Sequence, residues 1–174
     1  MKGYSSLYSN YSVGDSTYSS SPLQGNSQPY QEQYSVYSKM MKKDIESGVY
    51  DPTNGGYIKN PTAKPLDSLF DGNYIVGPNF TKTVPYVITT SGEVIIGNRN
   101  GFGRGPGTLP TPHPTLIGGI DPKVKMAGML QIKNGKIISY NDRSGHFRPN
   151  AKSMKWADEA FKKYPKHEDL KGDK

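Results

Sequence analysis

Residues 130–149 read LQIKNGKIISYNDRSGHFRP, and this stretch decides the expected fold. Two short runs that mix apolar and polar residues flank Asn134-Gly135, the dipeptide that most readily adopts positive φ at both centres of a type I′ turn. The stretch therefore predicts a β-hairpin. Just after it, Ser144, His146 and Arg148 occupy alternate positions, so an extended chain would place a hydroxyl, an imidazole and a guanidinium on one side.

Composition limits the size of the folded part. Only 33% of the 174 residues are hydrophobic, and the chain contains 20 glycines and 14 prolines, so a core along the whole length is not expected. The absence of cysteine excludes disulfides, thiolate zinc sites and cysteine nucleophiles. No apolar run is long enough to cross a bilayer, so we expect no membrane span.

The net charge of +7 is unevenly distributed. Residues 1–38 contain one lysine and two carboxylates, so residues 39–174 hold a net charge of +8. A basic folded domain attracts RNA, nucleotides or anionic surfaces, although lysines also serve solubility.

Four segments are predicted. Residues 1–38 form a disordered leader or linker rich in tyrosine and serine, and residues 39–83 form an extended arm with a short helix at 39–50. Residues 84–165 form the folded, effector-like domain, and residues 166–174 form a charged tail that frays.

Two further elements complete the predicted fold. A second hairpin joins residues 86–89 to residues 93–96, and a helix follows the N-cap Asn150 with apolar side chains at helical spacing. We therefore expect an α+β fold, a small antiparallel sheet of hairpins with one C-terminal helix packed on it, preceded by a disordered tail. Residues 98–120 should contain no strand or helix, and Gly128 should mark a bulge or a close backbone contact.

Two histidines are candidates for catalysis. His113 lies between two prolines that restrict its backbone, and His146 follows the second hairpin. Brought together, they could act as general base and general acid on RNA, as in a metal-independent ribonuclease. Either could instead be a structural hydrogen-bonding histidine. No HxH or HExxH pair occurs, so we expect neither a metal nor another cofactor.

Other polar residues would assist the two histidines. Arg148 and Arg143 would hold a phosphate, and Ser144 or Thr115 would orient it. In the glycine-rich residues 101–105, Arg104 could contact a phosphate and Phe102 could stack on a base.

Four strings in order, LPTPHPTLIGG at 109–119, AG at 127–128, NGKI at 134–137 and SGHFRP at 144–149, resemble C-terminal modules of bacterial Rhs-repeat, polymorphic-toxin-type proteins. The resemblance implies a toxin effector domain of interbacterial competition. It further implies export by a specialised secretion system, action in the target-cell cytoplasm, and an immunity protein as partner. The residues it singles out are His113, Thr115, Ser144 and His146.

Two alternatives remain beside a nuclease. An ADP-ribosyltransferase-type effector would bind NAD and would need a carboxylate such as Glu93 near the nicotinamide ribose. A non-catalytic binding or adhesion module would use the SGHFRP segment only as a sharp turn.

Overall fold

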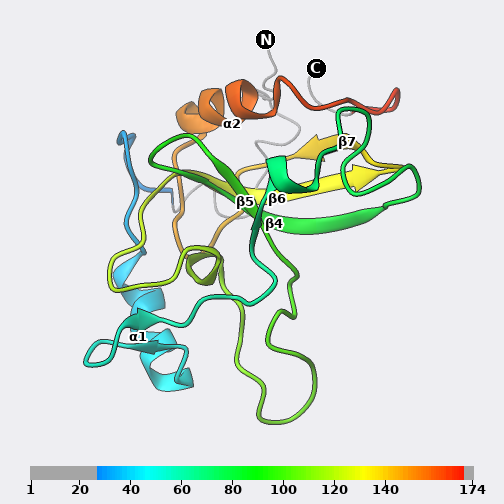
Figure 1. The fold of residues 1–174 in the computed structure, drawn as a ribbon. Helices are drawn as coiled ribbons and strands as arrows, with labels where there is room; N and C mark the ends of the chain where they lie inside the picture. Colours follow the sequence, from blue (N-terminus) through cyan, green and yellow to red (C-terminus); the bar gives the residue numbers. More distant parts are fainter. Residues whose placement is uncertain (1–26, 171–174) are drawn as a thin grey trace.

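The structure, a computed structural model, describes residues 27–170 and contains a five-stranded antiparallel sheet (Figure 1). The order of the strands across the sheet is β3-β5-β4-β6-β7. Their bounds are β3 (Lys64–Pro65), β4 (Lys82–Thr89), β5 (Val94–Ile96), β6 (Val124–Lys133) and β7 (Lys136–Tyr140). The predicted α+β class, a sheet of hairpins with a C-terminal helix, is confirmed. The predicted disordered tail falls mainly on residues 1–26, which lie outside the described residues.

Both predicted hairpins are present. Asn134 and Gly135 have φ values of 51° and 75°, as the type I′ turn between β6 and β7 requires. Strands β4 and β5 pair through Ile88 and Val94, and the turn between them is closed where the Thr89 N–H donates to the Glu93 carbonyl. Strand β4 also pairs with β6 along its whole length, so β4 and β6 form the centre of the sheet.

One face of the sheet carries the C-terminal helix. A 3-10 turn, η5 (Ala151–Ser153), leads into α2 (Met154–Phe161), and the Asn150 side chain accepts a hydrogen bond from the Lys152 N–H as the predicted N-cap. Phe161 is fully buried and its ring lies 5.1 Å from that of Tyr86 on β4. This contact is part of the larger core, which fills the space between α2 and the sheet.

The opposite side of the sheet carries α1 (Ser38–Ser47) and a two-stranded ribbon of β1 (Tyr50–Asp51) and β2 (Gly56–Tyr57) (Figure 1). The short helix predicted at residues 39–50 is therefore present. A second core cluster lies here, in which Tyr57, Val87 and Phe147 are buried together. The two cores thus lie on different faces of one sheet.

Residues 27–37, called the strap below, lie against the folded part. Tyr34 is fully buried, its backbone pairs with Val124, and its hydroxyl lies 2.7 Å from that of Ser153. Folded structure thus begins before residue 39, because tyrosine supplies the apolar contact area that the strap lacks in aliphatic residues. At the other end, His167 donates its N–H to the Ile137 carbonyl, which ties residues predicted to fray to β7.

The long connection after β5 is not wholly irregular. The prediction for residues 98–120 missed a 3-10 turn, η4 (His113–Leu116), which forms because Pro114 suits the first turn of a helix and Leu116 is buried in the second core. Another 3-10 turn, η3 (Leu66–Leu69), follows β3. None of the helices within residues 27–170 combines the length and apolar character that a bilayer crossing requires.

Candidate functional site

A buried carboxylate bonded to a histidine forms the centre of the candidate site. The His146 Nε2 atom lies 3.0 Å from one carboxylate oxygen of Asp44 and 3.1 Å from the other. The Tyr57 hydroxyl donates to the same carboxylate at 2.5 Å. The Asp44 side chain is only 7% exposed and that of His146 15%, so water screens this pair little.

Asp44 reaches this position because α1 ends just beyond it. Gly48 adopts the left-handed conformation at φ 88°, and the Gly48 and Val49 N–H groups donate to carbonyls of the last turn. The chain then reverses into β1, so that the β1–β2 ribbon packs beside the helix and brings the Tyr57 hydroxyl to Asp44. Burial, and next the hydrogen bond to Asp44, raise the pKa of Tyr57, so the hydroxyl stays protonated and remains a donor.

The segment that carries His146 is a tight turn and not the extended strand considered from sequence. The Arg148 N–H donates to the Ser144 carbonyl at 2.8 Å, and Arg148 has φ 45°. Burial of Phe147 in the second core explains the turn, because an extended chain would direct that side chain elsewhere. Ser144, His146 and Arg148 therefore do not share one side.

The strap fixes this turn from outside. The Tyr37 N–H donates to the His146 carbonyl at 2.7 Å, and the Gln28 side-chain amide donates to the Phe147 carbonyl at 2.6 Å. The Arg148 guanidinium lies 4.1 Å from the centre of the Tyr37 ring, a cation–π contact. The backbone carbonyls of His146 and Phe147 are thus held by hydrogen bonds from residues far away in sequence.

The second histidine has a different hydrogen-bond partner, a backbone carbonyl. The His113 Nε2 atom lies 2.8 Å from the Gly128 carbonyl oxygen, which can only accept, so Nε2 carries the proton and Nδ1 has the free lone pair. Burial lowers the pKa of His113 to about 4, with smaller contributions from the charges of His146 and Arg99, against the opposing effect of the Gly128 hydrogen bond. His113 is therefore neutral at pH 7.

The acceptor for His113 depends on a close backbone contact at Gly128, as predicted. A Cβ atom there would lie 1.9 Å from the Asn141 carbonyl oxygen. The Asn141 side chain in turn accepts from the Met129 N–H and the Arg143 N–H, both at 2.9 Å. Only glycine lets β6 approach the end of β7 this closely.

Ser144 and Thr115 lie inside the fold. The Ser144 Oγ atom accepts from the Phe147 N–H at 3.2 Å, and the Thr115 hydroxyl donates to the Pro112 carbonyl at 2.7 Å. Both residues are almost completely buried. Their hydroxyls close the local turns that carry His146 and His113.

The predicted substrate-binding residues are dispersed. Arg148 stacks on Tyr37 and also donates from Nε to the Gly145 carbonyl, while Arg143 is exposed. Phe102 packs partly against the second core. Arg104 lines a basic hollow together with Arg99, whose charge contributes to lowering the pKa of His113.

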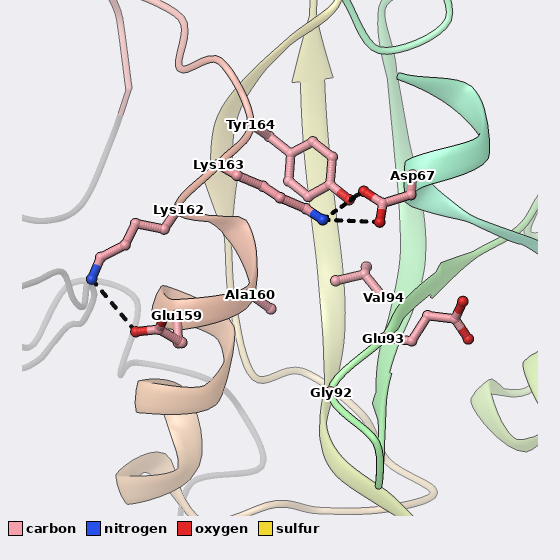
Figure 2. A pocket seen from close by; sticks show the side chains of 9 residues that line it. All are labelled: Asp67, Gly92, Glu93, Val94, Glu159, Ala160, Lys162, Lys163 and Tyr164. Carbon is pink, nitrogen blue, oxygen red and sulfur yellow. Dashed lines mark hydrogen bonds and ion pairs between the residues drawn. The ribbon is translucent and has the colours of Figure 1, made fainter. Parts of the chain in front are cut away.

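Glu93, the carboxylate considered for NAD chemistry, lies in a different groove. That groove, of about 440 Å³, is lined by the C-terminal part of α2, the β4–β5 turn and Asp67 (Figure 2). Figure 2 shows the Tyr164 hydroxyl and the Lys163 amine converging on Asp67. The carboxylate that meets His146 is thus Asp44 and not Glu93.

Sequence reasoning missed Asp44, Tyr57 and Arg99. Asp44 is one charged residue in a helix otherwise rich in lysine, and its histidine partner lies 102 positions away. No local spacing could connect the two. The one signal was indirect: a carboxylate on the helical stripe between Met41 and Ile45 must find a partner if that stripe packs.

Among residues 27–170, no group of three histidine, cysteine, aspartate or glutamate side chains is placed to hold a metal ion. Comparison of the chain with protein-family models, curated proteins and solved structures gave no match.

Proposed function

We propose that the protein is a metal-independent ribonuclease in which His113 and His146 are the catalytic residues. The observation that carries this proposal is that the fold fixes both imidazoles, with His113 neutral and bonded to the Gly128 carbonyl and His146 bonded to the buried Asp44 carboxylate. Cleavage of RNA by its own 2′-hydroxyl needs one group that takes a proton and another that gives one.

Under this proposal the two histidines have separate roles. His113 accepts the 2′-hydroxyl proton at Nδ1, because Nε2–H is engaged with Gly128. The 2′-oxygen then attacks phosphorus, the bond from phosphorus to the 5′-oxygen breaks, and His146 gives a proton to that oxygen, leaving a 2′,3′-cyclic phosphate. The Asp44 carboxylate orients the His146 ring and stabilises its positive charge, in the manner of the aspartate of a catalytic triad.

A bound phosphodiester would bring the basicity of His113 closer to neutrality. In the free protein its pKa is about 4, which makes it a weak base. The negative charge of a phosphate beside the ring favours the protonated form and raises this pKa. The base therefore gains strength when its substrate is bound.

The biological setting we propose is that of a toxin effector, which rests on the four sequence strings alone. Under it, the chain acts on RNA in the cytoplasm of a target cell after export, and an immunity protein protects the producer. The high basicity of residues 39–174 suits an RNA substrate.

Asp44 weighs against the ADP-ribosyl transfer alternative. A carboxylate that assists such a transfer must face the nicotinamide ribose, yet both Asp44 oxygens are bonded inside the protein and the side chain is 7% exposed. Asp44 therefore acts through His146. A purely binding or adhesive role remains the outcome if the chain proves harmless to cells.

Expression of the full chain inside a bacterium tests the proposal. We expect growth arrest with degradation of total RNA, and loss of both in His113→Ala and His146→Ala variants whose circular dichroism is unchanged. Purified protein should cleave RNA in EDTA and leave cyclic phosphate ends. Intact RNA during growth arrest would refute the nuclease, and activity retained in either alanine variant would refute the acid–base pair.

A further inference from the structure

A basic hollow opens where the chain leaves β5. Its volume is about 350 Å³, large enough for a nucleotide phosphate and its sugar, and three of its six lining residues are basic and none acidic. The lining residues are Lys82, Thr83, Asn98, Arg99, Asn100 and Arg104. Every one of these side chains can donate a hydrogen bond.

A buried asparagine holds one wall of this hollow in place. Asn60 is 2% exposed, and its side-chain amide donates to the Asn98 carbonyl while its Oδ1 atom accepts from the Thr62 N–H and hydroxyl. The Thr62 hydroxyl is also bonded to the Asn98 N–H at 2.8 Å. Gly101 passes so close to Asn60 that a Cβ atom there would lie 1.9 Å from Oδ1.

The same asparagine connects the hollow to the catalytic histidine. The Asn60 N–H donates to the Thr115 carbonyl at 2.7 Å, inside the 3-10 turn η4 that carries His113. The Thr111 hydroxyl donates to the Arg99 carbonyl, which ties the approach to η4 to the rim of the hollow. Arg99 itself lowers the pKa of His113, so its charge lies within electrostatic reach of the ring.

The chemistry of the lining selects an anion with several acceptor oxygens. Guanidinium groups bind phosphate with two parallel hydrogen bonds, and a lysine, a hydroxyl and amides can satisfy the remaining oxygens. A single carboxylate would leave most of these donors without a partner. The charge and the donors together fit a phosphodiester.

We propose that this hollow binds a second phosphate of the RNA strand that His113 and His146 cleave, and so positions the strand for cleavage. This inference rests on the proposed ribonuclease function for the identity of the strand. Phosphate contacts fix register without reading sequence, so we expect the hollow to contribute affinity and positioning and no base preference.

Binding to a non-cleavable RNA tests the inference apart from catalysis. The probe is a fluorescently labelled single-stranded RNA in which every 2′-hydroxyl is methylated, and the readout is fluorescence anisotropy of the full chain across a salt series. We expect Arg99→Ala/Arg104→Ala to weaken binding about tenfold or more at low salt. The slope of log K against log salt should fall by about 0.7, because the hollow neutralises one phosphate of the single strand.

The matched control is Lys162→Ala/Lys163→Ala, which removes two positive charges from the groove beside α2 (Figure 2). We expect it to change affinity less than about twofold, because both amines already bind carboxylates. An equal loss in the two double variants would overturn the inference, since binding would then follow net charge alone. Unaltered binding by Arg99→Ala/Arg104→Ala would overturn it as well.

The experiments distinguish an error in the proposed ribonuclease activity from an error in the proposed phosphate binding by the hollow. Binding that depends on Arg99 and Arg104, with no cleavage of ordinary RNA, supports the hollow and refutes the proposed catalysis. If cleavage needs both histidines but RNA binding does not depend on the two arginines, the result supports the nuclease and refutes phosphate binding in the hollow.

Discussion

Asp142 is a buried carboxylate whose replacement should stabilise the protein in a pH-dependent way. Asp142 is only 7% exposed, and its Oδ1 atom has no hydrogen-bond partner within the described part of the chain. Burial raises its pKa from 3.8 to about 7, partly offset by a hydrogen bond with its own backbone and by the charge of Arg143. The folded state therefore holds a proton there that the unfolded chain releases above pH 3.8.

The sign and size of the effect follow from proton linkage. Between pH 3.8 and about 7 the folded protein binds more protons at this carboxyl than the unfolded chain does, so stability falls as the pH rises through that window. At pH 8 the shift corresponds to at most about 4 kcal/mol of destabilisation, since each pKa unit corresponds to about 1.4 kcal/mol. Asp142→Asn removes the charge but buries an amide that lacks a full set of partners, so we expect a net gain of about 2 kcal/mol at pH 8.

Urea denaturation of the two proteins at pH 4.5 and pH 8 measures this difference. We expect Asp142→Asn to raise the free energy of unfolding by about 2 kcal/mol at pH 8. At pH 4.5 the carboxyl is protonated in the folded state and its burial costs only about 1 kcal/mol, while the amide still costs about 2 kcal/mol, so the variant should lose about 1 kcal/mol. Asp121→Asn is the control, because that side chain is 56% exposed and should change stability by less than about 0.5 kcal/mol at either pH. An equal effect of Asp142→Asn at both pH values would refute the reasoning.

Three further predictions concern the two histidines and the residues that hydrogen-bond to them. Asp44→Asn keeps the shape of the side chain but removes the carboxylate that is bonded to His146, so kcat for RNA cleavage should fall about 100-fold. A quench-flow assay at saturating RNA measures kcat, and an unchanged value would contradict the role of Asp44. Because the pKa of His113 is about 4 in the free protein, the ring should lose its base function only as the pH falls through that value. We therefore expect kcat/KM to decline below about pH 4. A decline centred at pH 6.5 would show that burial does not lower the pKa of the ring. Gly128→Ala would force β6 away from Asn141, so we expect thermal melts to show that the free energy of unfolding falls by more than about 2 kcal/mol. An unchanged free energy of unfolding would mean that the backbone can move apart at little cost.

The sheet could be predicted from sequence because its signals are local. Asn134-Gly135 specifies the backbone of its own turn, and Asn150 caps a helix two residues away, so both predictions needed only neighbouring residues. The α1 helix was found for the same reason. Its packing was not, because a lysine-rich helix with one weak apolar stripe does not indicate which surface it covers.

The candidate site could be predicted only in part. His113 and His146 were chosen because histidine is scarce, whereas their hydrogen-bond partners come from distant elements. Asp44 is brought to His146 by the docking of α1, and Gly128 meets His113 through its backbone carbonyl, which no side-chain pattern encodes. Ser144 or Thr115 was predicted to orient a phosphate; in the structure both hydroxyls bond nearby backbone, as short polar side chains next to turns often do.

The strap determines which truncations would remove part of the described fold. A protease acting before Ser27 would leave the hydrogen bonds of Gln28, Tyr34 and Tyr37 in place, and the turn around His146 would keep its external support. Cleavage at residue 38, next to the start of α1, would remove all of those bonds together with the buried Tyr34 ring. A fragment designed on composition alone would begin at that point and would lack part of its own folded unit, so fusions and truncations of this protein should begin at or before residue 27.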